Sequence, residues 1–371
     1  MRPLRLALIF CSISACGAVS AAAPAQACLR DLNALPAYLL ANDTGAKDHL
    51  AQVGKAQLDA ALARARAAAA KVRSDDECLK ALNTYVKAWR PTHIGVSPAP
   101  KPAAAKAATA PARTPTPPAP EKLPRLLLPS ERTAVLVLPS FSNEFREPLA
   151  NLLTTQRAAL ESRSRWIIDV RNNDGGSDST YAPLLPWIAA GRRVEIGAEF
   201  LATPANIAAH ARVCDLFAPG DAECAKHIGE LLPLLKSARP GTYVRPTDVP
   251  AMEIVEPDPA PGRRPTHVLV LIDRECYSSC EQFLLSVRQN FNVKLKGRRT
   301  AGSLDYSNVR PHPLPSGKRL LWYATSRSLR LPHLPVDVAG VIPDIYVPRA
   351  EGEDSDAELK RAVAWIENTP S

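Results

Sequence analysis

The sequence has no apolar run long enough to cross a lipid bilayer. A membrane-spanning helix needs about 20 apolar residues in succession. The apolar run near the start, Leu6–Ile13, is much shorter, and no later run is long enough. Histidines at zinc-ligand spacing from a cysteine pair are missing as well, which argues against a zinc site. We expect no membrane-spanning helix, no bound metal and no cofactor.

The sequence also lacks a cluster of basic residues. The formal net charge is +9 at pH 7, but the basic residues are spread along the chain and no aromatic residues are interleaved with them. This distribution is not typical of a nucleic-acid-binding protein, so we expect no nucleic-acid partner. It suits a basic envelope protein that meets anionic surfaces or acidic peptides.

The first 27 residues have the features of a secretory signal peptide. Arg2 and Arg5 precede the short apolar run, and Ala25-Gln26-Ala27 is a small-residue cleavage site ahead of Cys28. These are the three parts of such a signal. We therefore expect a mature chain that begins near residue 28 and is periplasmic.

A second way of processing the start is also open. Ile13-Ser14-Ala15-Cys16 resembles a lipoprotein box. Cleavage there would leave Cys16 as a lipidated N-terminus, and the protein would be a membrane-anchored lipoprotein. Either route carries the protein beyond the inner membrane.

Six cysteines remain after residue 27, and an even number in an oxidising compartment indicates disulfide bonds. Their grouping predicts a Cys28–Cys78 bridge across an N-terminal helical unit and a Cys214–Cys224 bridge that closes a short loop. Cys276 and Cys280 either form a third bridge or remain two small buried thiols.

Composition divides the rest of the chain into four parts. Residues 28–96 have apolar positions at helical spacing and predict a small helical unit, and residues 97–124 are rich in proline and alanine and predict an extended linker. Residues 125–350 form the core, and 351–371 contain a last amphipathic helix. Within the core, apolar strands alternate with helices, which predicts an α/β fold with a mostly parallel, covered sheet. Residues 200–265 are read as loop-rich.

Two segments far apart in the core suggest chemistry. One buried strand runs into the turn Gly175-Gly176, and another, His267–Asp273, leads to Ser278 at the start of a helix. A serine at a strand-to-helix turn lies beside free backbone N–H groups and the positive end of the helix dipole. A neighbouring glycine turn can bring amides close to an oxyanion. Together they predict an acyl-transfer site.

With these residues in view, the chain resembles the C-terminal processing (tail-specific) serine peptidases and their tricorn-type relatives over roughly residues 134–348. Ordered signatures carry the resemblance. They are Ile167-Ile-Asp-Val-Arg-Asn-Asn-Asp-Gly-Gly-Ser177, Ser278-Ser-Cys-Glu281, Gly297-Arg-Arg-Thr-Ala-Gly302, Leu314-Pro-Ser-Gly317 and Gly340-Val-Ile-Pro-Asp-Ile345.

The chain departs from the family pattern at the catalytic base. Members with a serine–lysine dyad carry a lysine just after the Thr-x-Gly element, where this chain has Ser303. A PDZ-like insertion is also missing. Tricorn-type members use a histidine at the end of the N-terminal helical region, and His93 stands there. They also have an acidic residue ahead of the Gly-Val-x-Pro-Asp element, where this chain has Asp337.

The resemblance implies a role for each of these residues. Ser278 is the nucleophile, although a serine there could instead cap the helix. Gly175, Gly176 and the amide of Ser279 form the oxyanion hole, and the Ser279 hydroxyl makes it a rival nucleophile. Glu281 is read as structural.

His93 is the expected general base, because serine needs a group of near-neutral pKa to take its proton. His312 and His333 are the alternatives. Asp337 is expected to orient the base, and Asp305 is another possible acidic partner.

The resemblance implies a crotonase-like (ClpP-like) core and a secreted serine endopeptidase that cleaves unfolded or C-terminal peptide segments through an acyl-enzyme. The missing lysine supports an alternative function, a catalytically inactive family member that binds peptides in the envelope. Oligomeric state is not implied.

Overall fold

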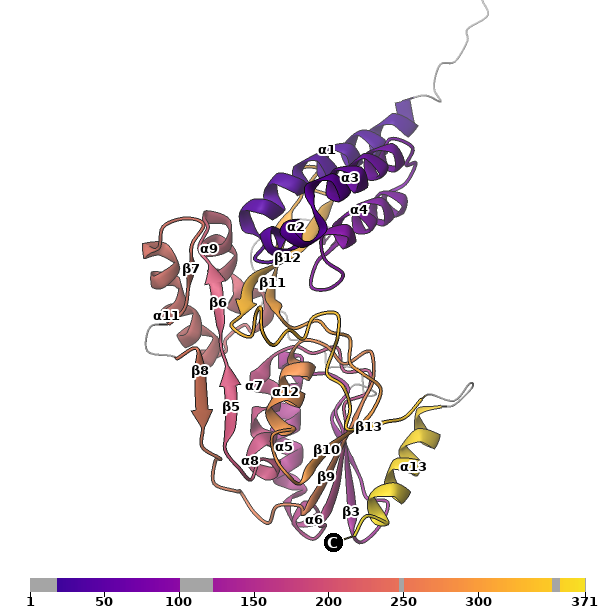
Figure 1. Cartoon of the computed structure of the whole chain (residues 1–371), viewed down its shortest axis with the longest axis vertical. Coiled ribbons are helices and arrows are strands. Elements are labelled where there is room, and N and C mark those ends of the chain that lie inside the picture. Colours follow the sequence, from indigo (N-terminus) through magenta and orange to yellow (C-terminus); the bar gives the residue numbers. More distant parts are fainter. Residues whose placement is uncertain (1–18, 101–122, 247–249, 349–353, 371) are drawn as a thin grey trace, which may run out of the picture.

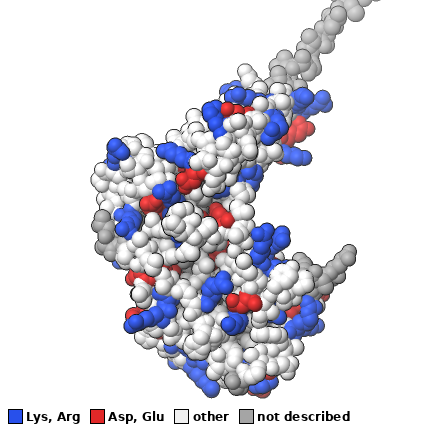
Figure 2. All heavy atoms as spheres, in the orientation of Figure 1, with Lys and Arg blue, Asp and Glu red and all other residues white. Residues whose placement is uncertain are grey.

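The computed structural model describes residues 19–100, 123–246, 250–348 and 354–370 (Figure 1). The basic and apolar parts of the expected signal peptide, Cys16 and most of the expected linker lie outside these residues. None of the described helices is both long and apolar enough to cross a membrane. On the face in Figure 2, basic side chains are spread among acidic ones.

Four helices form the N-terminal unit: α1 (Val19–Asn42), α2 (Ala46–Val53), α3 (Lys55–Ala69) and α4 (Asp75–Trp89). α1 therefore runs through the expected cleavage site at Ala27. The side chain of Ser74 caps α4 by accepting a hydrogen bond from the Glu77 amide, and acidic residues fill the first turn, as the helix dipole favours. Leu32 and Leu82 belong to the fully buried core between the helices.

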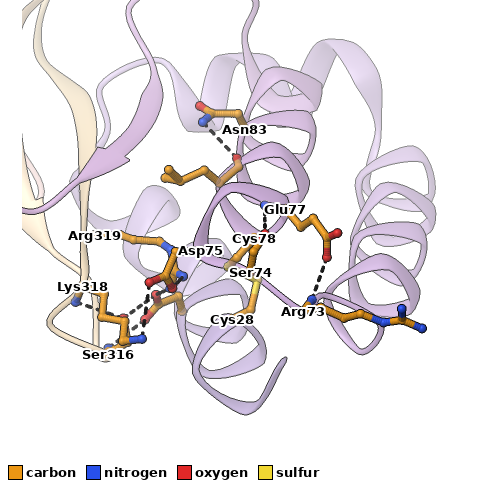
Figure 3. The surroundings of a disulfide bond; sticks show 12 residues. Cys28, Arg73, Ser74, Asp75, Glu77, Cys78, Asn83, Ser316, Lys318 and Arg319 are labelled. Atoms are coloured by element: carbon orange, nitrogen blue, oxygen red, sulfur yellow. Dashed lines mark hydrogen bonds and ion pairs between the residues drawn. A yellow bond between two sulfur atoms is a disulfide. The ribbon is translucent and has the colours of Figure 1, made fainter. Parts of the chain in front are cut away.

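The Cys28–Cys78 disulfide joins α1 to α4 as predicted (Figure 3). Beside it, the buried guanidinium of Arg319 donates to Asp31 at 2.9 Å. Asp31 also accepts from the amide and hydroxyl of Ser316. Because Ser316 and Arg319 lie far along the chain from α1, these bonds attach the helical unit to the rest of the protein.

A six-stranded sheet forms the centre of the core, in the order β13-β10-β9-β4-β3-β2. All its pairings are parallel except that of β2 with β3. Its strands are β2 (Arg125–Leu127), β3 (Thr133–Val137), β4 (Arg165–Asp169), β9 (His267–Ile272), β10 (Val293–Gly297) and β13 (Ile345–Tyr346).

Helices cover both faces of this sheet (Figure 1). Ile168 and Val270 face the larger core, whereas Ile167 and Leu269 face Ile366 of α13. Burial on both faces explains why the strands are almost continuously apolar. The covering elements are η2 (Asn143–Phe145), α5 (Arg146–Thr155), α6 (Arg157–Glu161), α7 (Asp178–Tyr181), η3 (Ala182–Leu184), α8 (Leu185–Ile188), α12 (Ser279–Val287) and α13 (Ser355–Glu367).

A second sheet has five strands and is entirely antiparallel. It contains β1 (Gly95–Pro98), β6 (Ala198–Leu201), β7 (Tyr243–Val244), β11 (Tyr306–Pro313) and β12 (Arg319–Ser328). The fold is therefore mixed α/β, as predicted, but a mostly parallel arrangement describes only the six-stranded sheet. The sequence did not predict the second sheet because its strands come from distant parts of the chain.

The prediction that residues 200–265 are loop-rich is wrong. They contain α9 (Pro204–His210), α10 (Val213–Phe217), α11 (Ala222–Ser237) and β8 (Met252–Val255), which pairs with β5 (Arg193–Ile196). Ile228, Leu231 and Leu235 recur at helical spacing and are buried, so the helical pattern was present. The predicted Cys214–Cys224 bridge is formed and joins α10 to α11.

A buried ion pair holds the end of the helical unit in place. The guanidinium of Arg90 donates twice to the carboxylate of Asp43, at 2.7 and 2.9 Å. Asp43 also accepts from the Ala324 amide of β12. The chain after Arg90 continues into β1, which pairs with β12. Residues 90–95 are thereby attached to the antiparallel sheet.

We predict that Arg90→Met lowers the free energy of unfolding by about 3–5 kcal/mol, because Asp43 is then left buried without its counter-charge. Lys55→Met is the control: it removes the exposed Lys55–Asp59 pair and should cost about 0–1 kcal/mol. Urea unfolding measures both. Equal losses would show that the Arg90–Asp43 pair does not hold the helical unit.

Candidate active site

Ser278 occupies a sharp turn between β9 and α12. Its φ and ψ are 60° and −124°, and the Cys280 amide donates to the Tyr277 carbonyl oxygen at 3.1 Å. These values describe a type II′ turn with Ser278 at the first central position, which usually requires glycine. A non-glycine residue held in such a conformation is often functional.

The hydroxyl of Ser278 does not cap the helix. α12 has no side-chain capping bond at its N-terminus, although the Ser278 carbonyl oxygen accepts from the Gln282 amide at 3.0 Å. The helix-capping interpretation of Ser278 therefore has no support in the geometry. The hydroxyl remains available for another interaction.

The glycine turn after β4 lies directly against Ser278. A Cβ placed on Gly175 would lie 2.6 Å from the Tyr277 carbonyl oxygen and 2.9 Å from Ser278 Cβ. The φ of Gly175 is 79°, which favours glycine for a second reason. The buried side chain of Asn173 supports the turn by accepting from the Gly175 amide and donating to the Leu138 carbonyl oxygen.

Two backbone amides at this junction have no hydrogen-bond partner among the described residues. They are the amides of Gly176 and of Ser279, the first residue of α12. The amide of Gly175, in contrast, is engaged with Asn173. Of the two glycines expected in the oxyanion hole, only Gly176 therefore has a free donor, and Gly175 instead provides the close approach.

The carboxylate of Glu281 fixes the loop opposite the turn. It is fully buried and accepts from the Thr300 hydroxyl and from the amides of Gly302 and Ser303. Burial raises its pKa, while these hydrogen bonds oppose the shift. The Ser303 carbonyl oxygen then accepts from the Ser278 amide at 2.9 Å. Ser303, in the position of the family lysine, thus supports the nucleophile turn through its backbone.

His93 contacts the same loop further along. Its Nδ1 lies 2.6 Å from the Tyr306 carbonyl oxygen, and its φ is 50°. Arg90 donates to the carbonyl oxygens of Thr92 and His93, which fixes the backbone on either side of the imidazole. Burial, and then the charge of Arg90, lowers the pKa of His93 to about 4.

Asp337 does not contact the imidazole of His93. Its Oδ1 accepts from the amides of Leu304 and Asp305, and its Oδ2 is buried without a partner. Burial raises its pKa. Asp305 in turn accepts from the amides of Val336 and Asp337. The two carboxylates thus join the 304–306 loop to the 336–337 loop.

The alternative bases are placed differently. His312 stacks on Tyr38 of the helical unit, with ring centroids 3.8 Å apart. It lies six residues beyond Tyr306 along β11, which is about 20 Å of strand. His333 is exposed on the surface. Neither has a hydrogen bond to the 303–306 segment, whereas His93 does.

The sequence reasoning missed Asp178, which directly follows the glycine turn as the first residue of α7. Its carboxylate accepts hydrogen bonds from the hydroxyls of Ser279 and Tyr181, and desolvation raises its pKa. Ser279 therefore directs its hydroxyl to Asp178, unlike Ser278. The position of Asp178 next to Gly175-Gly176 was the available signal. In the described part of the chain, no group of three or more His, Cys, Asp or Glu side chains could hold a metal ion.

A serine in this conformation beside unpaired amides is typical of acyl-transfer sites. Residues 132–347 match peptidase family S41, and the chain belongs to this family. This supports a hydrolase that acts on peptide bonds. No match is found among curated proteins.

Solved structures show the same fold at low identity. A candidate peptidase from Parabacteroides merdae has 14% identity and a TM-score of 0.55, with 92% of this chain and 99% of that chain covered. A lipoprotein from Streptococcus agalactiae has 13% identity and a TM-score of 0.47, with 92% and 96% covered. The tricorn protease has 16% identity and a TM-score of 0.34, with 64% and 18% covered.

We predict that His93 titrates with a midpoint near pH 4, well below the ordinary histidine pKa of 6.5. Between these values the unfolded chain binds the proton more readily, so this group's contribution to stability is lost as the pH falls from about 6.5 to about 4. NMR titration measures the midpoint, with His93→Gln to assign the signal. A midpoint near 6.5 would contradict the buried environment.

Gly175→Ala should destabilise the fold more than Gly220→Ala. Both glycines have φ near 80°, but nothing lies within 4 Å of a Cβ on Gly220. The backbone strain, about 1–2 kcal/mol, is therefore common to both, and only Gly175→Ala adds a collision with the Ser278 turn, worth about 1–3 kcal/mol more. Urea unfolding gives the difference. Equal losses would mean that the turn yields freely.

Proposed function

We propose that this protein is a secreted serine endopeptidase with a crotonase-like core that cleaves unfolded or C-terminal peptide segments. One observation carries the proposal: Ser278 is held in a glycine-like turn with its hydroxyl uncapped, beside two unpaired amides. The disulfides are consistent with an oxidising compartment. We infer that this compartment is the periplasm.

In the proposed reaction, the hydroxyl oxygen of Ser278 attacks the scissile carbonyl carbon. The carbonyl oxygen becomes an oxyanion that the amides of Gly176 and Ser279 stabilise. The positive end of the α12 dipole adds to this stabilisation. The acyl-enzyme formed when the amine leaves is then hydrolysed by water.

His93 is the proposed general base. Donation from Nδ1 to the Tyr306 carbonyl oxygen would leave Nε2 without a proton and able to accept one. The low pKa keeps the imidazole neutral at pH 7. Its anchor at Tyr306 is three residues from Ser303, which binds the Ser278 amide. Three residues of extended chain span at most about 10 Å, which supports a common site.

Asp337 is proposed to act on the base indirectly. It binds the amides of Leu304 and Asp305, which immediately precede the carbonyl group that holds His93. Asp337 would therefore orient His93 through the loop. Asp305 reinforces the same loop by accepting from the amides of Val336 and Asp337.

The proposed substrate is a peptide bound in extended form. Strand addition to a sheet edge is the usual way in which proteins hold such segments, and an unfolded or C-terminal segment has the free backbone that this requires. The recognition of the substrate end by particular side chains is not part of this proposal.

The presence of Ser303 where the family dyad has lysine favours a second candidate function, an inactive peptide-binding protein of the envelope. In that function Ser278 would be a relic of the fold. Saturable peptide binding without turnover, unchanged in Ser278→Ala, would distinguish it from the peptidase.

We predict that Ser278→Ala and His93→Ala each lower the hydrolysis of an unstructured protein substrate by at least about 100-fold, as expected for a nucleophile and its base. Ser279→Ala is the matched control and should retain most activity, because it keeps the backbone amide. Circular dichroism confirms folding of each variant.

Other outcomes separate the alternatives. Loss with Ser278→Ala but not with His93→Ala would make His312 or His333 the base. Loss with Ser279→Ala alone would move the nucleophile to Ser279. A folded wild-type chain that binds peptide without hydrolysing it would replace the peptidase with the binding protein.

A further inference from the structure

A disulfide bond encloses the nucleophile turn. Cys276 and Cys280 are bonded to each other with a sequence separation of 4, so the closed loop contains Tyr277, Ser278 and Ser279. The third bridge is thus present, whereas the sequence had left the two thiols as an alternative. Both cysteines are fully buried, which shields the bridge from reductants in the folded protein.

The enclosed turn is the part of the site that needs restraint. Ser278 has a positive φ without being a glycine, and such a conformation persists only where the surroundings impose it. If the turn relaxed, the hydroxyl would move and the Ser279 amide would rotate. Both groups that the proposed reaction uses would then be lost together.

Hydrogen bonds hold the turn only from outside. The Ser278 amide donates to the Ser303 carbonyl oxygen, and the Cys276 carbonyl oxygen accepts from the Ala301 amide. These bonds tie the turn to the 301–303 loop. The disulfide differs because it links the residue before the turn to the second residue of α12, and so limits the turn whatever the loop does.

The length of its loop indicates that this bridge acts locally. The three disulfides have sequence separations of 50, 10 and 4. In the chain-entropy description, a bridge stabilises the whole fold more when it closes a longer loop. The Cys276–Cys280 bridge therefore contributes least to overall stability, although it lies directly on the nucleophile.

We propose that Cys276 and Cys280 are positioning residues whose disulfide holds Ser278 in its reactive conformation, so that activity appears only after the bridge has formed. This inference rests on the proposed peptidase function. In bridge formation the two thiols lose two electrons and two protons to a disulfide oxidant, such as oxidised glutathione, which becomes two thiols. Before this oxidation, the chain would fold with its nucleophile misaligned.

The test compares the double variants C276A/C280A and C214A/C224A with the wild type. Hydrogen exchange measured by mass spectrometry reports on the turn without requiring activity. In C276A/C280A we expect the Ser278 and Gln282 amides to exchange at least about tenfold faster, because relaxation of the turn breaks their bonds. In C214A/C224A these amides should exchange as in the wild type.

Kinetics with an unstructured protein substrate provide the second measurement. C276A/C280A should lose about tenfold or more in kcat, a change of about 1.4 kcal/mol, with KM nearly unchanged because peptide binding does not need the turn. C214A/C224A should retain its kcat. A merely structural bridge would lower the melting temperature without this separation of kcat from KM.

The two measurements keep the outcomes distinct. Unchanged exchange in C276A/C280A, or a kcat no lower than in C214A/C224A, would overturn the positioning role. A wild type that does not hydrolyse the substrate would count against the proposed peptidase. Faster exchange of the turn in C276A/C280A would still support the brace in that case.

Discussion

The buried carboxylate of Glu281 is the interaction on which the candidate site depends. A buried charge is tolerated only when hydrogen bonds satisfy it, and here the donors are the Thr300 hydroxyl and the Gly302 and Ser303 amides. The loop is thereby fixed to α12. Its next residues present the carbonyl groups that bind the Ser278 amide and the His93 imidazole. One buried group thus sets the positions of the proposed nucleophile and base.

The antiparallel sheet brings the N-terminal part of the chain to this loop. β1 follows His93 directly and pairs with β12, and β12 pairs with β11, which begins at Tyr306. The Arg90–Asp43 pair fixes the other side of His93. The expected linker comes after β1, so its flexibility does not separate His93 from the core. Charge burial at Arg90 also contributes to the low pKa of the imidazole.

Several features could be predicted from the sequence because they depend on local patterns. Apolar runs such as Trp166–Val170 predicted buried parallel strands, and the even set of cysteines predicted disulfides that the structure contains. The helices within 200–265 were missed because their apolar positions are interrupted by proline, glycine and charged residues. Asp178 was missed because its bond to the Ser279 hydroxyl depends on the packing of α7 against α12.

The sequence by itself determined the family signatures, the serine at a strand-to-helix junction and the glycine turn, since each depends on residues that are neighbours in the chain. Only the tertiary structure decided which amides are free, that Gly176 rather than Gly175 has an unpaired donor, and that Asp337 binds backbone amides rather than His93. Hydrogen bonds between distant segments depend on sub-ångström placement, and no pattern along one chain encodes that placement directly.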